Sequence, residues 1–166
     1  AAGFVCLLIR LSFFDVQFAA AGLFSCWALL IIGLADLKYM IIPDQFVIML
    51  ALSAFGFVPY HDSFWQPLLG ALIGGGVMLM VSVLGGAAFK KEVMGFGDVK
   101  LFASLGLALG VKGTVAALIG ASLLSGIFAA AGLASGKYKK DDVKPLGPYI
   151  CGCGAFYIFV VWPFLL

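Results

Sequence analysis

Long apolar stretches alternate with short breaks that are polar or rich in Gly and Pro along the whole chain. A helix that crosses about 30 Å of hydrocarbon needs roughly 20 residues, so each long stretch predicts one membrane span. The predicted spans are 17–37, 44–60, 66–89, 98–112, 113–135 and 145–166. The breaks fall at Pro43, at "PYHDSFWQP", at "KKEVMGFG", near Lys112 and Gly113, and at "GKYKKDDVKP". Helices stop at sequences of this kind.

The shorter apolar segment at 1–14 predicts one more helix. The pattern therefore predicts an all-α fold: a polytopic integral membrane bundle with six core transmembrane helices and an extra N-terminal helix. The composition agrees, since 64% of the residues are hydrophobic and only 11% are charged, against about 25% charged residues in soluble domains. Because the apolar stretches recur throughout, we expect 1–166 to be a single transmembrane domain in contact with membrane lipid.

The net charge of +2 is small, and the basic residues form short clusters between apolar stretches, which argues against a nucleic-acid partner. No pair of cysteines has the CxxC spacing typical of zinc and redox sites, so we predict that they are buried as small apolar side chains. The four cysteines are Cys6, Cys26, Cys151 and Cys153.

The lysines predict the orientation, because cytoplasmic loops near span ends carry an excess of Lys and Arg. Alternating the spans leaves only Arg10 and Lys112 on one side of the membrane. The other side, which we predict to be cytoplasmic, carries Lys38, Lys90, Lys91, Lys100, Lys137, Lys139, Lys140 and Lys144. The loop with His61 and Asp62 should face outward, with a solvated histidine and no chemistry.

Two acidic residues are candidates for chemistry, because ionisable groups near the membrane interior are costly and tend to be functional. Asp36 closes one apolar span and Asp98 opens another, and two complete crossings lie between them. Both side chains must then lie near the cytoplasmic surface, where helix packing could bring them together. A close pair of carboxyl groups does not readily hold two charges, so one stays protonated while the other is ionised.

Such a pair supplies the acid and the base of aspartyl protease chemistry. The ionised carboxylate takes a proton from a water that attacks a peptide carbonyl, and the protonated one hydrogen-bonds the carbonyl oxygen. From the helix dipoles we expect Asp98, at a helix start, to be the base and Asp36, near a helix end, to be the acid. Gly95 and Gly97 leave room for an extended substrate strand beside Asp98.

Structural roles are the alternative, and on spacing alone they outweigh catalysis. Asp98 could be the N-cap of its helix, and Asp36 could pair with a nearby lysine at the membrane surface. Asp44, directly after Pro43, has an even stronger case as a cap of the next helix.

Three segments resemble one known family. "GFGDVK" matches the GxGDxK pattern of type IV prepilin peptidases, "ADLKYMIIPD" is similar to the segment with their other catalytic Asp, and "KPLGPYICGCG" is similar to their "PFGP" segment. GxGD alone is a weak signal, because presenilin-like proteases carry it too. The order and spacing of all three agree from about residue 17 to the end.

The resemblance implies an aspartic-type intramembrane endopeptidase that removes the short basic leader of prepilins and pseudopilins at the cytoplasmic face of the inner membrane. It assigns Asp36 and Asp98 as the catalytic pair, with no catalytic metal and no cofactor for proteolysis. The residues that it assigns to shaping the site are Gly95, Gly97, Lys100, Pro145, Gly147 and Pro148, with Leu146 in place of the family's Phe.

The chain departs from the family in one respect. Many members also methylate the new N-terminus through an N-terminal region and a cytoplasmic loop with two CxxC pairs, and neither stands in this sequence. Methylation by this chain is therefore doubtful. Either the chain is a peptidase-only member, or the missing part lies upstream of Ala1, and S-adenosylmethionine is a cofactor only in the second case.

Two other functions remain open on the sequence. Membrane carboxylates also serve proton-coupled transporters, although relay acids are expected nearer the midplane than span margins. A non-catalytic subunit of a pilus or secretion machine would tolerate Asn at position 36 or 98, which a protease would not.

Overall fold

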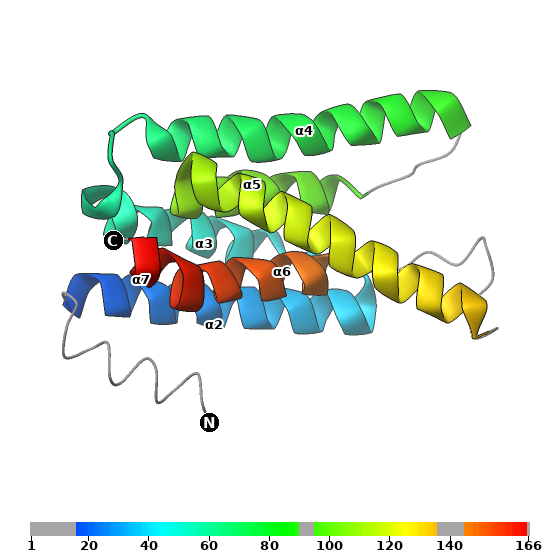
Figure 1. The fold of residues 1–166 in the computed structure, drawn as a ribbon, viewed down its shortest axis with the longest axis horizontal. Coiled ribbons are helices and arrows are strands. Elements are labelled where there is room, and N and C mark those ends of the chain that lie inside the picture. Colours follow the sequence, from blue (N-terminus) through cyan, green and yellow to red (C-terminus); the bar gives the residue numbers. More distant parts are fainter. Residues whose placement is uncertain (1–15, 90–94, 136–144, 166) are drawn as a thin grey trace.

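The computed structural model describes residues 16–89, 95–135 and 145–165 (Figure 1). Within these ranges the regular structure is entirely helical, which confirms the all-α prediction. The elements are α2 (Val16–Tyr39), α3 (Asp44–Phe57), the 3₁₀ turn η1 (Val58–Tyr60), α4 (Gln66–Phe89), α5 (Phe96–Ala134), α6 (Gly147–Phe156), the π-helical turn η2 (Tyr157–Val161) and α7 (Trp162–Leu165). The helix predicted at 1–14 lies outside the described residues.

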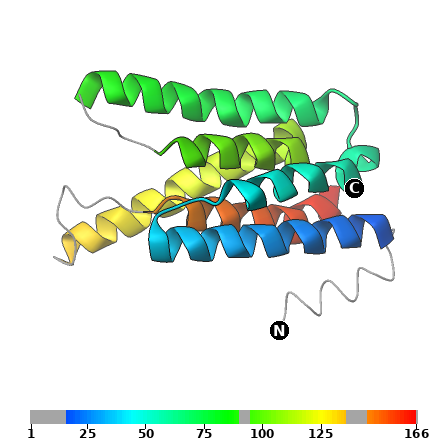
Figure 2. The same cartoon turned by 180° about the vertical axis from the view of Figure 1, so that it is seen from behind.

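The helix α5 changes direction at Gly110. That residue has φ 66° and ψ −171°, a backbone conformation that is essentially restricted to glycine. Figures 1 and 2 agree that the first part of α5 runs toward the end of the bundle where α4 begins, and that the later part runs back. We predicted a break near Lys112 and Gly113, and the break lies close by, at Gly110. Gly113 is helical and packs against Tyr157, so the reversal comes just before it.

Three of the described helices are long and apolar enough to cross a membrane: Val16–Tyr39, Gln66–Ala87 and Phe96–Gly132. Two shorter apolar helical runs, Asp44–Tyr60 and Gly147–Val161, accompany them. Large apolar side chains also cover the outside of the bundle, as lipid contact requires; Leu34, Phe55 and Ile127 are examples. The chain is an integral membrane protein, and the count of six core transmembrane helices stays a prediction.

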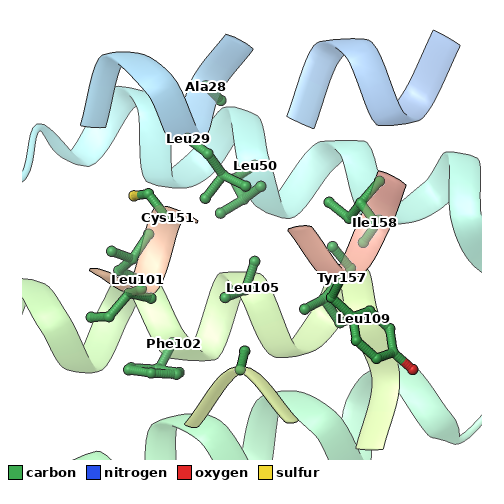
Figure 3. Close-up of a cluster of buried hydrophobic side chains, with 14 of the residues drawn as sticks. Ala28, Leu29, Leu50, Leu101, Phe102, Leu105, Leu109, Cys151, Tyr157 and Ile158 are labelled. Carbon is green, nitrogen blue, oxygen red and sulfur yellow. The ribbon is translucent and has the colours of Figure 1, made fainter. Parts of the chain in front are cut away.

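The core lies between α2, α3, α5 and the α6–η2 run. Leu29 of α2, Leu50 of α3, Leu105 of α5 and Ile158 of η2 belong to one buried cluster (Figure 3). The hydroxyl of Ser25 joins α2 to α3 inside this core, because it lies 2.8 Å from the hydroxyl of Ser53. This packing fixes how the ends of the helices lie relative to one another.

One end of the bundle gathers the parts of the chain that carry the candidate residues. In both views α2 ends where α3, α5 and α6 begin (Figures 1 and 2). Asp36, near the end of α2, and Asp98, in the first turn of α5, therefore share this end. The opposite end carries the connection from η1 to α4 and the reversal of α5.

The helices α4 and α5 cross at glycines. A Cβ atom on Gly70 would overlap the backbone of Gly106, and a Cβ on Gly74 would lie 2.6 Å from the carbonyl oxygen of Phe102. Small residues at such a crossing let two backbones approach closely, which is how membrane helices gain packing energy without a hydrophobic driving force. The glycines of "GALIGGG" thus fix α4 against the helix that carries Asp98.

We expect Gly74→Ala to destabilise the bundle by about 1–3 kcal/mol, because the clash is with backbone and cannot be relieved by a side-chain rotation. The free energy of unfolding, measured by titration with a denaturing detergent in mixed micelles, checks this. Gly76→Ala on the same helix is the matched control, because a Cβ there meets nothing within 4 Å. Equal stability of the two variants would contradict the close crossing.

Candidate active site

Asp36 is buried near the end of α2, with 6% of its surface exposed. Its Oδ2 accepts a hydrogen bond of 2.9 Å from the backbone N–H of Gly147, the first residue of α6. No lysine pairs with this carboxyl group among the described residues, so the surface ion-pair interpretation gains no support from them. The bond instead fixes the orientation of the carboxyl group against the start of α6.

Asp98 is the third residue of α5 and is half-buried. An N-cap residue has non-helical backbone angles and precedes the first helical residue, so the capping interpretation of Asp98 is wrong. Its Oδ1 is buried and has no hydrogen-bond partner in the part of the chain that the structure describes. An unpaired buried carboxyl oxygen is costly in a purely structural residue, which favours a functional role for Asp98.

The structure brings the two acids into one site. The carboxyl groups of Asp36 and Asp98 are close enough to interact electrostatically, and the buried Cys151 of α6 lies near both. Both acids also face helix starts, since Asp98 lies in the first turn of α5 and Asp36 lies against the first residue of α6. The helix-dipole argument therefore does not separate an acid from a base, and that division of roles stays a prediction.

Of the other residues of the GxGDxK segment, Gly95 accepts a backbone hydrogen bond of 3.1 Å from the N–H of Asp98. Gly95 is exposed and a Cβ on it would meet nothing, whereas a Cβ on Gly97 would lie 3.1 Å from the Cβ of Ile42. Lys100 forms an ion pair with Asp44, its Nζ lying 2.9 and 3.0 Å from the two carboxylate oxygens. Asp44 makes no cap hydrogen bond at the start of α3, so its predicted role as a cap is wrong.

The later segment contributes the start of α6. Pro145 and Leu146 precede the helix and are partly buried. Gly147 contacts Asp36, and Pro148 packs toward α2, with its Cα 3.7 Å from where a Cβ on Gly33 would lie. The segment therefore meets the helix of Asp36, and the site-shaping role that the resemblance implies for it stays a prediction.

Sequence reasoning missed two residues beside the acids, Gly33 and Cys151. A Cβ on Gly33 would lie 3.5 Å from the Cβ of Cys151, so these residues let α2 and α6 approach next to the site. The helical spacing of Gly33 and Asp36 on one face of α2 was a signal that could have identified Gly33.

Cys151 was predicted to be buried, and the structure confirms this. Cys26 and Cys153 are partly exposed, which is contrary to the prediction, and Cys6 lies outside the described residues.

The charged residues at the opposite end lie apart from this site. His61 is not solvated as predicted: its ring packs 5.0 Å from that of Trp162, its Nε2 is buried, and burial lowers the pKa of its imidazole. Lys112 lies 3.0 Å from Asp62 and holds the pKa of that carboxyl below its ordinary value.

Lys38 and Lys100 lie at the end of the bundle that carries Asp36 and Asp98, as the charge pattern predicted, and Lys112 lies at the opposite end.

The remaining charges used for orientation lie outside the described residues: Arg10, Lys90, Lys91, Lys137, Lys139, Lys140 and Lys144. Within the described ranges, no three His, Cys, Asp or Glu side chains gather so that they could hold a metal ion. The expectation of proteolysis without a metal or cofactor stays a prediction.

Comparison with known proteins places these residues in context. The family model described as the type IV leader peptidase family matches residues 23–130, a range that contains Asp36, Asp98 and Lys100. A prepilin leader peptidase/N-methyltransferase of Bacillus subtilis is 34% identical over 74% of this chain and 48% of its own length. Proteins of the same name from Xanthomonas campestris pv. campestris and Pseudomonas aeruginosa are 32% and 31% identical over 88% and 87% of this chain.

These two matches cover 51% and 50% of the relatives, so the chain spans about half the length of the curated relatives it matches. No solved structure gives a significant match. The family model covers well over half of the chain, and its range includes both interacting acids. The chain therefore belongs to the type IV leader peptidase family.

Proposed function

We propose that this chain is an intramembrane aspartyl endopeptidase that cleaves the leader peptide of type IV prepilins or pseudopilins. The observation that carries the proposal is the electrostatic interaction of two carboxyl groups, Asp36 and Asp98, at one end of a membrane bundle. Family membership supports the reaction class, since the related proteins are named as prepilin leader peptidases. The substrates follow from those names and are proposed for this chain.

The chemistry needs only these two groups and a water molecule. One ionised carboxylate accepts a proton from the water, whose oxygen attacks the carbonyl carbon of the scissile peptide. The other carboxyl group, protonated, donates a hydrogen bond to the carbonyl oxygen and stabilises the tetrahedral intermediate. When the intermediate collapses, the C–N bond breaks, the amine leaves with a proton, and the new carboxyl terminus belongs to the leader.

The position of the acids suits a substrate cut at the membrane margin. Asp36 and Asp98 lie near helix ends rather than in the middle of long helices, so a scissile segment has to enter only the edge of the bilayer. Lys38 and Lys100 at the same end support a cytoplasmic site, by the excess of positive charge in cytoplasmic loops. We therefore propose an inner-membrane protein with six core spans and a site that faces the cytoplasm.

Methylation is a separate question. The related proteins carry N-methyltransferase in their names, and the chain matches only about half of their length. We propose that these residues carry the peptidase activity alone, and that S-adenosylmethionine has a role only where further chain supplies a site for it.

Mass spectrometry of a prepilin incubated with the purified chain in lipid vesicles tests the proposal. We expect two products whose masses sum to the substrate plus one water, cut at the junction between the basic leader and the apolar segment. The mature product should lack the added mass of a methyl group even when S-adenosylmethionine is present. An intact substrate after incubation with folded protein would contradict the peptidase proposal. A methylated product would contradict the proposal that these residues carry the peptidase activity alone.

A further inference from the structure

The connection between α2 and α3 leaves the site directly beside Asp36. The N–H of Met40 donates a hydrogen bond of 2.9 Å to the carbonyl oxygen of Asp36, and Met40 has a positive φ of 52°. A left-handed residue of this kind terminates a helix and turns the chain sharply. The path of residues 41–44 is therefore set from the same turn of α2 that carries the Asp36 carboxyl group.

The same connection contacts the start of α5 at two points. The side chain of Ile42 packs against Gly97, where an added Cβ would come within 3.1 Å of it. The Nζ of Lys100 donates hydrogen bonds of 2.9 and 3.0 Å to the two carboxylate oxygens of Asp44. The two contacts flank Asp98 in the sequence, one residue before it and two after it.

Stability alone does not account for the ion pair. The side chains of Lys100 and Asp44 are 44% and 65% exposed, and exposed pairs contribute only about 0–1 kcal/mol to folding. Near the N-terminus of α5, the positive end of the helix dipole also disfavours a cation. Asp44, in contrast, lies in the first turn of α3, where the dipole favours it. Lys100 thus lies at a position where the dipole of α5 disfavours a positive charge, and its partner comes from another helix, α3.

Positioning is a role in which a weak contact matters. The Asp98 Oδ1 has no hydrogen-bond partner among the described residues, so no hydrogen bond from them to this oxygen orients the carboxyl group. Its position is set by the first turn of α5, which the Ile42 and Asp44 contacts hold on both sides. A displacement of about 1 Å in a reacting group can cost on the order of 100-fold in rate, far more than the pair contributes to stability.

We propose that the Asp44–Lys100 ion pair, together with the Ile42–Gly97 contact, is a clamp that positions Asp98 relative to Asp36. Asp44 and Lys100 are then positioning residues and do not touch the reacting atoms. The clamp ties both acids to one short connection, so their separation is set locally rather than through the whole bundle. The expected effect of the clamp on catalysis rests on the proposed peptidase function.

Kinetics of leader cleavage provide the first test. We expect Asp44→Asn and Lys100→Met each to lower kcat by about tenfold with KM nearly unchanged, the effect of a misplaced reacting group. The double variant should be no worse than either single one. The reversed pair, Asp44→Lys with Lys100→Asp, should recover part of the lost kcat. Full activity in the single variants, or a loss that appears only in KM, would overturn the clamp.

A matched control lies at the other end of the bundle. Lys112 and Asp62 form an ion pair of 3.0 Å whose side chains are 70% and 72% exposed, so it matches the clamp in residue types and distance and is the more exposed of the two pairs. Asp62→Asn and Lys112→Met should leave kcat unchanged. An equal loss of kcat in these variants would show that any ion pair between the helices has the same effect and would overturn a specific role for Asp44 and Lys100.

A distance measurement tests the clamp without activity, so that its failure is distinguishable from failure of the proposed function. Nitroxide labels at two exposed positions, Leu37→Cys beside Asp36 and Gly95→Cys three residues before Asp98, report the separation of the two helix ends in a background without native cysteines. We expect Asp44→Asn to broaden the distance distribution measured by pulsed electron paramagnetic resonance, and Asp62→Asn to leave it unchanged. An unchanged distribution in Asp44→Asn would overturn the clamp, whether or not the chain cleaves prepilins.

Discussion

Replacing Asp36 or Asp98 with Asn should lower the rate of leader cleavage by about 100- to 10,000-fold. Each carboxyl group supplies a proton transfer or a hydrogen bond in the transition state, and a positioned acid or base contributes roughly 10²–10⁴-fold. Asn keeps the size of the side chain and removes only the titrating group, so packing around the buried Asp36 changes little. The measurement is the initial rate of leader release from a prepilin in lipid vesicles, followed by mass.

The losses of rate caused by the two substitutions should not be additive. The two groups act in the same step, so the double variant should be about as slow as the slower single variant, as in other catalytic units. Asp62→Asn, at the opposite end of the bundle, is the control for removing one carboxylate from the molecule, and it should cleave at the wild-type rate. Cleavage at the wild-type rate by either single variant with native helix content would remove that aspartate from the mechanism. It would also favour a non-catalytic role for the chain.

The parts of the fold that the sequence predicts are those governed by local hydrophobicity. The boundaries of α2, α4 and the α3–η1 run follow the predicted spans to within a few residues, because a change from apolar to polar composition is visible in the sequence itself. The reversal in α5 lies at Gly110, slightly before the position predicted near Lys112 and Gly113. Composition favours a helix break at a lysine followed by a glycine, but the reversal requires a positive φ, and the chain adopts it at Gly110. Propensity does not reveal which of two nearby glycines takes that conformation.

The candidate site divides in the same way. That Asp36 and Asp98 share one end of the bundle follows from counting crossings, and this needs no knowledge of packing. The partner of each acid does not follow, because it comes from distant chain: Gly147 is 111 residues from Asp36, and Lys100 is 56 residues from Asp44. These pairings depend on the angles at which helices pack. His61 was misjudged for the same reason, since Trp162, which covers it, belongs to the last helices.

The activity should also be sensitive to the start of α6, and Gly147→Ala tests this. A Cβ at this position would lie 2.6 Å from Oδ2 and 2.9 Å from the Cγ of Asp36. The aspartate side chain is short and is held in a buried turn of α2, so it must rotate or the two helices must separate. Either response breaks the hydrogen bond from the Gly147 N–H. We expect kcat to fall by about 100-fold, the cost of moving a reacting group by roughly 1 Å.

Gly152→Ala is the matched control for this change. It lies on the same helix, and a Cβ there meets nothing within 4 Å, so the substitution should leave kcat unchanged and stabilise the helix by up to about 1 kcal/mol. Gly147→Ala gains the same helix propensity, so any loss of activity in it arises from the contact with Asp36 and not from the removal of a glycine. Equal kcat values for the two variants would mean that the Asp36 carboxyl group reacts without being held by α6, and the hydrogen bond would then be structural.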